Sequence, residues 1–139
     1  MKYFLIIMTF IGIVTLTSCE LPEEGLRVSY EVVAIDSVQM PTVFSFGETY
    51  DIPVYYKKPT DCHVFEGFNV TAQLNVRNIS TVLARLDSSG ECFEDNLREE
   101  QSLRFTAASN GSYVFRFFNG FDPNSNEETF IEYIVQVVE

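Results

Sequence analysis

The feature that most constrains the fold is a succession of seven short segments rich in β-branched and aromatic residues. Val, Ile, Thr, Tyr and Phe favour strands, whereas the Gly, Pro, Asn, Asp and Ser clusters between the segments favour turns. The segments are 27–36, 47–56, 68–77, 79–87, 102–108, 111–118 and 129–138. This pattern predicts an all-β fold, namely a single antiparallel β-sandwich with about seven strands in an immunoglobulin-like arrangement. Segment 92–103 is compatible with one or two helical turns.

Two of these segments alternate clearly between apolar and other side chains, which places the apolar ones on one face of a strand. In 27–36 this face carries Val28, Tyr30, Val32 and Ala34, and in 47–56 it carries Tyr50, Ile52, Val54 and Tyr56. The sequence therefore predicts which side chains share a face in each of these two strands.

The first residues are unlike the rest of the chain. Lys2 is followed by an apolar run from Tyr3 to Leu16, shorter than the roughly 20 residues that a membrane-spanning helix needs. Such a run after a positive charge is typical of a secretory signal peptide. We therefore expect residues 1–18 to be removed, the alternative being a buried N-terminal helix or strand.

The end of that run, Leu16-Thr17-Ser18-Cys19, resembles the lipobox of bacterial lipoproteins. The resemblance implies cleavage before Cys19, a diacylglyceryl group on its sulfur and acylation of the new amino terminus. Each buried methylene contributes about 0.8 kcal/mol to membrane attachment, so several chains hold a protein firmly. The alternative is an ordinary signal peptide cut near Cys19, which would leave the protein without a lipid anchor.

The resemblance also predicts the layout of the mature chain and its location. Residues 19–26, with three glutamates, read as a lipidated tether, and 27–139 read as the β-sandwich domain. Glu20 is not the aspartate that retains lipoproteins in the inner membrane of enteric bacteria, so the cell envelope, and within it the outer membrane, is expected. Whether the domain faces the periplasm or the cell surface stays open.

Charge limits the partners. The mature chain would carry eight basic against 20 acidic residues, a formal charge of −12. Phosphate backbones repel such a chain, so nucleic acid is not expected as a partner. The predicted contact with the membrane is through the N-terminal lipid.

With Cys19 assigned to lipid, Cys62 and Cys92 are the two remaining cysteines, and an exported compartment is oxidising. They are predicted to form a disulfide, which would contribute about 3–4 kcal/mol by constraining the unfolded chain. A metal site at Cys62 and His63 and a reactive thiol are the alternatives. His63 is the one histidine of the chain, which falls short of a copper site and leaves zinc dependent on reduced cysteines.

Two further groups of side chains are candidate sites. Oxygen-bearing side chains at alternate positions could bind calcium, or could simply form a polar hairpin loop: Asp122, Asn124, Asn126 and Glu128. An exposed aromatic surface, with core packing as the alternative, is predicted for Tyr55, Tyr56, Phe65 and Phe68. Three stretches match the acceptor pattern for N-glycosylation, which we interpret as coincidence: Asn69-Val-Thr71, Asn78-Ile-Ser80 and Asn110-Gly-Ser112.

The sequence contains no recognisable catalytic motif, and no cofactor is expected. Over its length, the mature chain is similar to small bacterial lipoproteins with a β-sandwich body, through segments 47–56, 59–68 and 111–138. That resemblance implies a fold and a location but no activity. We expect a non-enzymatic binding or structural module, with an envelope protein or a glycan as partner. An envelope inhibitor of a lytic enzyme or a small hydrolase is the alternative.

Overall fold

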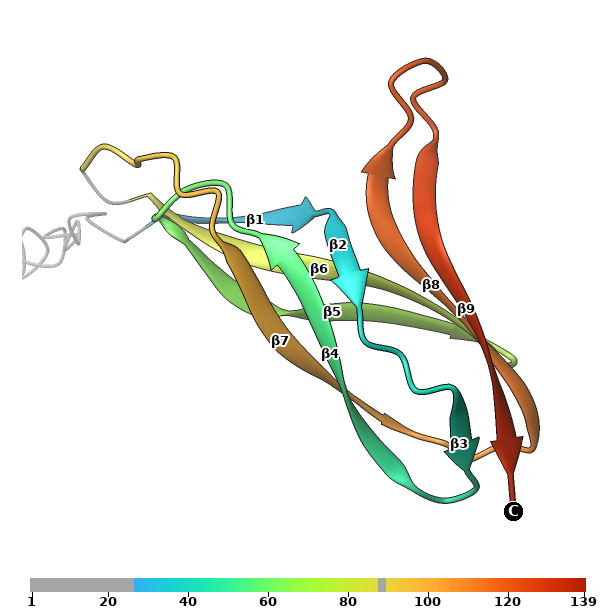
Figure 1. Ribbon diagram of the computed structural model, residues 1–139. Coiled ribbons are helices and arrows are strands. Elements are labelled where there is room, and N and C mark those ends of the chain that lie inside the picture. Colours follow the sequence, from blue (N-terminus) through green and yellow to red (C-terminus); the bar gives the residue numbers. More distant parts are fainter. Residues whose placement is uncertain (1–26, 88–89) are drawn as a thin grey trace, which may run out of the picture.

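The computed structural model describes residues 27–87 and 90–139, and in this part of the chain the fold is all-β (Figure 1). Its strands are β1 (Arg27–Val33), β2 (Ile35–Val38), β3 (Val43–Ser45), β4 (Thr49–Lys57), β5 (His63–Gln73), β6 (Val76–Asp87), β7 (Arg98–Thr106), β8 (Gly111–Phe121) and β9 (Glu128–Val138). Nine strands are thus found over the described ranges, not about seven. The predicted leader 1–18, the tether 19–26 and Cys19 lie outside the described residues.

The strands form two sheets. The larger has the order β1-β6-β8-β9-β3, with β5 also paired to β6, and the smaller has the order β2-β4-β7. Most pairs are antiparallel, but β6 pairs with β8, and β3 with β9, in parallel. The prediction of a wholly antiparallel sandwich is therefore wrong at these two pairs, because β3 and β8 join their partners through long connections and not through hairpins.

Side chains of both sheets meet in a core dominated by aromatic rings. The largest fully buried ones are Tyr56, Tyr113, Phe44, Phe115 and Phe117. The alternation predicted for β4 is confirmed, since Ile52, Val54 and Tyr56 are all fully buried and Tyr50 packs partly against the same cluster. Inward-facing residues of the two sheets thus interdigitate, as expected when two sheets pack face to face.

The face predicted for segment 27–36 is formed, but it is not buried. Val28, Tyr30 and Val32 do share one face of β1, but they are 43–66% exposed. Arg27, Ser29 and Glu31 on the other face are exposed too, so only Val33 of this strand is buried. Ala34 lies between β1 and β2 and belongs to neither strand. Alternation identifies the members of a face but does not say whether a second sheet covers that face.

Segment 92–103 contains no helix. Its second half begins β7 at Arg98, which pairs with Lys57 of β4. The expectation of one or two helical turns is wrong, because main-chain pairing with β4 determines the conformation of this charged stretch. Over residues 27–87 and 90–139, the structure has no helix long and apolar enough to cross a bilayer.

The predicted disulfide is confirmed: Cys62 and Cys92 are bonded, with a sequence separation of 30. The bond ties the turn before β5 to the segment before β7. Nearby, Thr60 and Glu94 form an isolated antiparallel bridge, and the Phe93 amide donates to Asp61 Oδ1 at 2.9 Å. The disulfide therefore closes one end of the sandwich, where strands of both sheets end.

Candidate functional site

A hollow of about 640 Å³ lies on the outer face of the larger sheet, where two strands diverge. The first part of β6, Val76–Ile79, pairs with β8, whereas Thr81–Asp87 pairs with β1 on the same side. Beyond Phe117, β8 leaves β6, and in Figure 1 the hairpin of β8 and β9 bends away from β1. This divergence opens a space that side chains of five strands line.

The register of the strands places the side chains that line the hollow on one face of the larger sheet. Across β5, β6 and β8, Thr71 is opposite Asn78, which is opposite Arg116. One step along, Asn69 is opposite Ser80 on β5 and β6, and Phe118 is opposite Phe130 on β8 and β9. The lining residues outside the core are Val32, Asn69, Thr71, Asn78, Ser80, Arg116, Phe118, Phe121, Glu128 and Phe130.

A β-bulge determines where the last aromatic residue of β8 points. The register of β8 with β9 shifts between Phe118 and Gly120, leaving Asn119 as an extra residue, and Gly120 has φ of 113°. Without the extra residue, Phe118 and Phe121 would face opposite sides, because side chains alternate along a strand. With it, Phe121 is opposite Glu128 and joins Phe118 at the hollow. Asn119 Nδ2 donates to the Ile35 carbonyl at 2.7 Å, which fixes this bend to β2.

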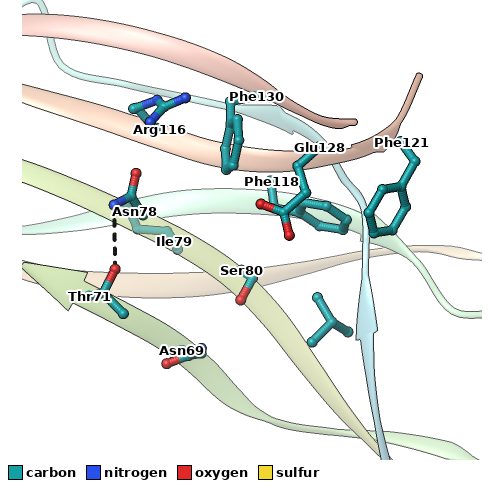
Figure 2. Close-up of a pocket in the computed structure, with 11 residues that line it drawn as sticks. Asn69, Thr71, Asn78, Ile79, Ser80, Arg116, Phe118, Phe121, Glu128 and Phe130 are labelled. Atoms are coloured by element: carbon teal, nitrogen blue, oxygen red, sulfur yellow. Dashed lines mark hydrogen bonds between the residues drawn. The ribbon is translucent and has the colours of Figure 1, made fainter. Parts of the chain in front are cut away.

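Three phenylalanines form one wall of the hollow. The ring centroid of Phe118 lies 5.3 Å from that of Phe121 and 6.3 Å from that of Phe130, and both contacts are edge-to-face. Phe118 is buried, whereas Phe121 is 58% exposed. Figure 2 shows Phe118, Phe121 and Glu128 on one side of the space, with Ser80 and Asn69 on the other. The aromatic wall thus faces a polar wall.

One cation, Arg116, and one carboxylate, that of Glu128, line the hollow. The guanidinium of Arg116 lies 4.3 Å from the ring centroid of Phe130 and 3.6 Å from a carboxylate oxygen of Glu132. Glu128, at the far end of the hairpin, is exposed. Since stacking and the ion pair restrain Arg116, its fork of donors is held beside the aromatic wall.

The polar wall contains an unsatisfied acceptor. Asn78 Nδ2 donates to Thr71 Oγ1 at 3.4 Å, but the buried Oδ1 of Asn78 accepts no hydrogen bond from any described protein group. A buried acceptor left unpaired costs about 1–3 kcal/mol.

The predicted aromatic surface is not formed as one surface. Tyr56 is fully buried, and its ring stacks 6.0 Å from that of Phe65, which contacts Phe68 at 5.1 Å. Tyr55 lies on the opposite face of β4, with the guanidinium of Arg98 4.3 Å from its ring. Adjacent residues of a strand point to opposite sides, so Tyr55 and Tyr56 cannot share a surface.

The predicted calcium-binding residues form a polar hairpin loop. Asp122 Oδ1 accepts the backbone N–H groups of Asn124 at 2.8 Å and Ser125 at 3.0 Å, and these bonds lower the pKa of the Asp122 carboxyl. Asn126 has φ of 56°, and its amide donates to the Asp122 carbonyl. Glu128 lies at the start of β9. The structure explains the turn without an ion, and calcium binding stays a prediction.

His63 is buried and lies beside the disulfide. Its Nδ1 is 2.7 Å from Thr60 Oγ1 and its Nε2 is 3.0 Å from Glu31 Oε2. A hydroxyl, an imidazole and a carboxylate in a row have the composition of a nucleophile, base and acid. His63 is only 4% exposed and lies outside the lining of the hollow, so we interpret the row as a structural clamp.

Of the described residues, one set of three metal-ligating types lies close enough to hold an ion: Asp61, Cys62 and Cys92. Both sulfurs are in the disulfide, and Asp61 already accepts the amide of Phe93. The set is therefore a consequence of the disulfide, and it gives no support to the metal alternative.

Sequence reasoning missed the hollow, although one signal was present. The polar wall consists of Asn69, Thr71, Asn78 and Ser80, which belong to two of the three acceptor patterns that we interpret as coincidence. An Asn two residues before a Thr or Ser puts an amide and a hydroxyl on the same face of a strand. Two such pairs on neighbouring strands predict a polar patch, but not what faces it.

Comparison with protein-family models, with curated proteins and with solved structures gave no significant match.

Proposed function

We propose that this chain is a lipid-anchored lipoprotein of the cell envelope, and that it acts as a non-enzymatic binding module. The observation that carries the binding role is the hollow on the outer face of the larger sheet. It combines an aromatic wall with amide and hydroxyl groups, and its size is within the range of ligand pockets, about 300–1,000 Å³. Such a lining suits recognition, because apolar surface supplies affinity and a few polar groups supply specificity.

The anchor is proposed from the apolar leader and the lipobox ending in Cys19. The acidic composition agrees with attachment through lipid, since basic residues that would bind an anionic membrane surface are few. We place the protein in the outer membrane, tethered through residues 19–26. For the domain itself, we propose an immunoglobulin-like sandwich, which the two sheets and the aromatic core between them support.

The anchor is tested by metabolic labelling with an alkyne-bearing fatty acid in a bacterial host that processes lipoproteins. The full chain should take up label and sediment with membranes, whereas Cys19→Ala should lose the label and leave the membrane fraction. Cys62→Ser is the matched control, because it removes a different sulfur and should keep the label. Label on Cys19→Ala at the level of the unchanged protein would refute the anchor.

A further inference from the structure

We propose that the hollow binds a neutral saccharide, with the face of one sugar ring against Phe121 and its hydroxyls on the opposite polar wall. This inference rests on the binding role proposed above and names the class of ligand. Three observations support it: the two unlike walls, the exposure of Phe121 and the balance of charge.

The two walls match the two kinds of surface that a saccharide presents. A pyranose ring has C–H groups on its faces and hydroxyls around its edge. Phenylalanine offers an apolar face without a hydrogen-bonding atom, and its ring attracts C–H groups through its negative face. Phe121 can therefore take a ring face, while Phe118 keeps it in position through an edge-to-face contact at 5.3 Å. Phe130 already carries the Arg116 guanidinium over its ring, 4.3 Å from the centroid, and extends the apolar wall through its contact with Phe118 at 6.3 Å.

The exposure of Phe121 costs free energy unless something covers it. The ring is 58% exposed at the rim of the hollow, although it belongs to a strand whose other phenylalanines, Phe115, Phe117 and Phe118, are buried. The bulge at Asn119 brings Phe121 to this face. Because this bulge puts an aromatic ring on the outer face of the sheet, where the ring is exposed, we infer that a ligand covers the ring there.

The polar wall offers both donors and acceptors. Asn69 and Asn78 each have an amide, and Thr71 and Ser80 each have a hydroxyl, so together they can donate and accept. Saccharide hydroxyls also do both. A wholly apolar ligand would bury these groups unpaired, at a cost of several kcal/mol in total, about 1–3 for each.

The charges at the hollow favour a ligand without net charge. Arg116 is balanced by Glu132 at 3.6 Å, and Glu128 adds a further carboxylate at the rim. The chain as a whole carries −11. An anionic ligand would meet this field and a guanidinium that already has a partner, so a neutral saccharide is favoured over an acidic one.

The experiment uses the full chain, expressed with its own leader and purified from membranes. The detergent must have a polyoxyethylene head group, because a maltoside or glucoside would itself be a ligand. The protein is applied to an array of neutral oligosaccharides of two to six units, beside sulfated versions of the same sugars and a library of short peptides. The best neutral hit is then titrated by calorimetry. Binding of neutral sugars in preference to their sulfated versions is the expected result.

Two variants place that binding in the hollow. Phe121→Ala and Asn69→Ala should each weaken the neutral hit about tenfold, because one removes a ring contact and the other a hydrogen-bonding group. Phe93→Ala is the matched control, since Phe93 is 65% exposed and lies at the disulfide end, outside the hollow. Circular dichroism and thermal melting of each variant establish that it is folded.

The outcomes separate this inference from the proposed binding role. The saccharide proposal is overturned if no neutral sugar binds. It is also overturned if the neutral hit binds Phe121→Ala and Asn69→Ala as tightly as it binds the control Phe93→Ala. If sulfated sugars or peptides bind instead, and Phe121→Ala abolishes that binding, the saccharide is overturned while the binding role stands. If no probe of any class depends on Phe121, both are overturned. The lipid anchor is judged by labelling alone.

Discussion

Nε2 of His63 lies 3.0 Å from Oε2 of Glu31, so one side chain joins β5 to β1 over the strand β6 that separates them. Nδ1 of the same ring is 2.7 Å from Oγ1 of Thr60, in the connection that precedes β5. His63 is 4% exposed, while Glu31 is half exposed. The imidazole is therefore a buried link between three parts of the chain at the disulfide end of the sandwich.

His63→Ala should lower the free energy of unfolding by about 2–3 kcal/mol, because it leaves a cavity and removes the partner of Thr60. Chemical denaturation of the oxidised protein measures this. Gln136→Ala, at an exposed site on β9, should change it by no more than about 0.5 kcal/mol. An effect of His63→Ala as small as that of the control would contradict the clamp.

Removing the disulfide should lower the free energy of unfolding by more than His63→Ala does. The bond joins residues 30 apart in sequence, and the chain-entropy model gives about 3–4 kcal/mol for a loop of that length. The double variant Cys62→Ser, Cys92→Ser should unfold at a correspondingly lower denaturant concentration than the oxidised protein. Titration of free thiols in the unfolded, unreduced protein should find neither Cys62 nor Cys92. Equal midpoints for the two proteins would argue against the stabilising role.

Some of the fold follows from local pattern and some does not. The alternation of β4 predicts its buried face correctly, because the charged Asp51 falls on the opposite face of the strand from Ile52 and Val54. β7 begins with Arg98-Glu-Glu-Gln101, a stretch whose residue types do not favour strands. This stretch is a strand because it pairs with β4. The parallel pairing of β6 with β8 joins segments more than 30 residues apart in sequence, and local pattern carries no information about such a pair.

The candidate site illustrates the same limit. Asn69 and Ser80 are polar residues in predicted strands, and their alternation gives the face that each would occupy. Their position opposite Phe121 depends on the divergence of β8 from β6 and on one extra residue at Asn119. Because a single inserted residue reverses the faces of a strand, a site that depends on a bulge cannot be located from alternation alone.

The turn between β8 and β9 should respond to acid through Asp122. Backbone N–H bonds, that of Ser125 first, hold the pKa of this carboxyl below its usual value, so an NMR titration should give a midpoint below about 3.9. Because the folded pKa is lowered, the ionised group stabilises the fold above the unfolded pKa, and this contribution is lost as the pH falls through the folded pKa. Asp122→Asn keeps an oxygen acceptor without the charge and should lack this dependence. A midpoint at or above the usual value would contradict it.

Two glycines at bulges should respond in opposite ways to alanine. Gly120 has φ of 113°, a conformation that residues with a side chain rarely adopt, although the nearest atom to an added Cβ would be Ala34 Cβ at an ordinary 3.8 Å. Gly120→Ala should therefore destabilise the protein by about 1–3 kcal/mol through backbone strain alone. Gly67, at the bulge of β5, has no positive φ and open space around an added Cβ. Gly67→Ala should be neutral or raise stability by up to about 1 kcal/mol, because it restricts the unfolded chain. Thermal unfolding of both variants measures the difference, and equal melting temperatures would mean that the bulge that turns Phe121 outward does not depend on glycine.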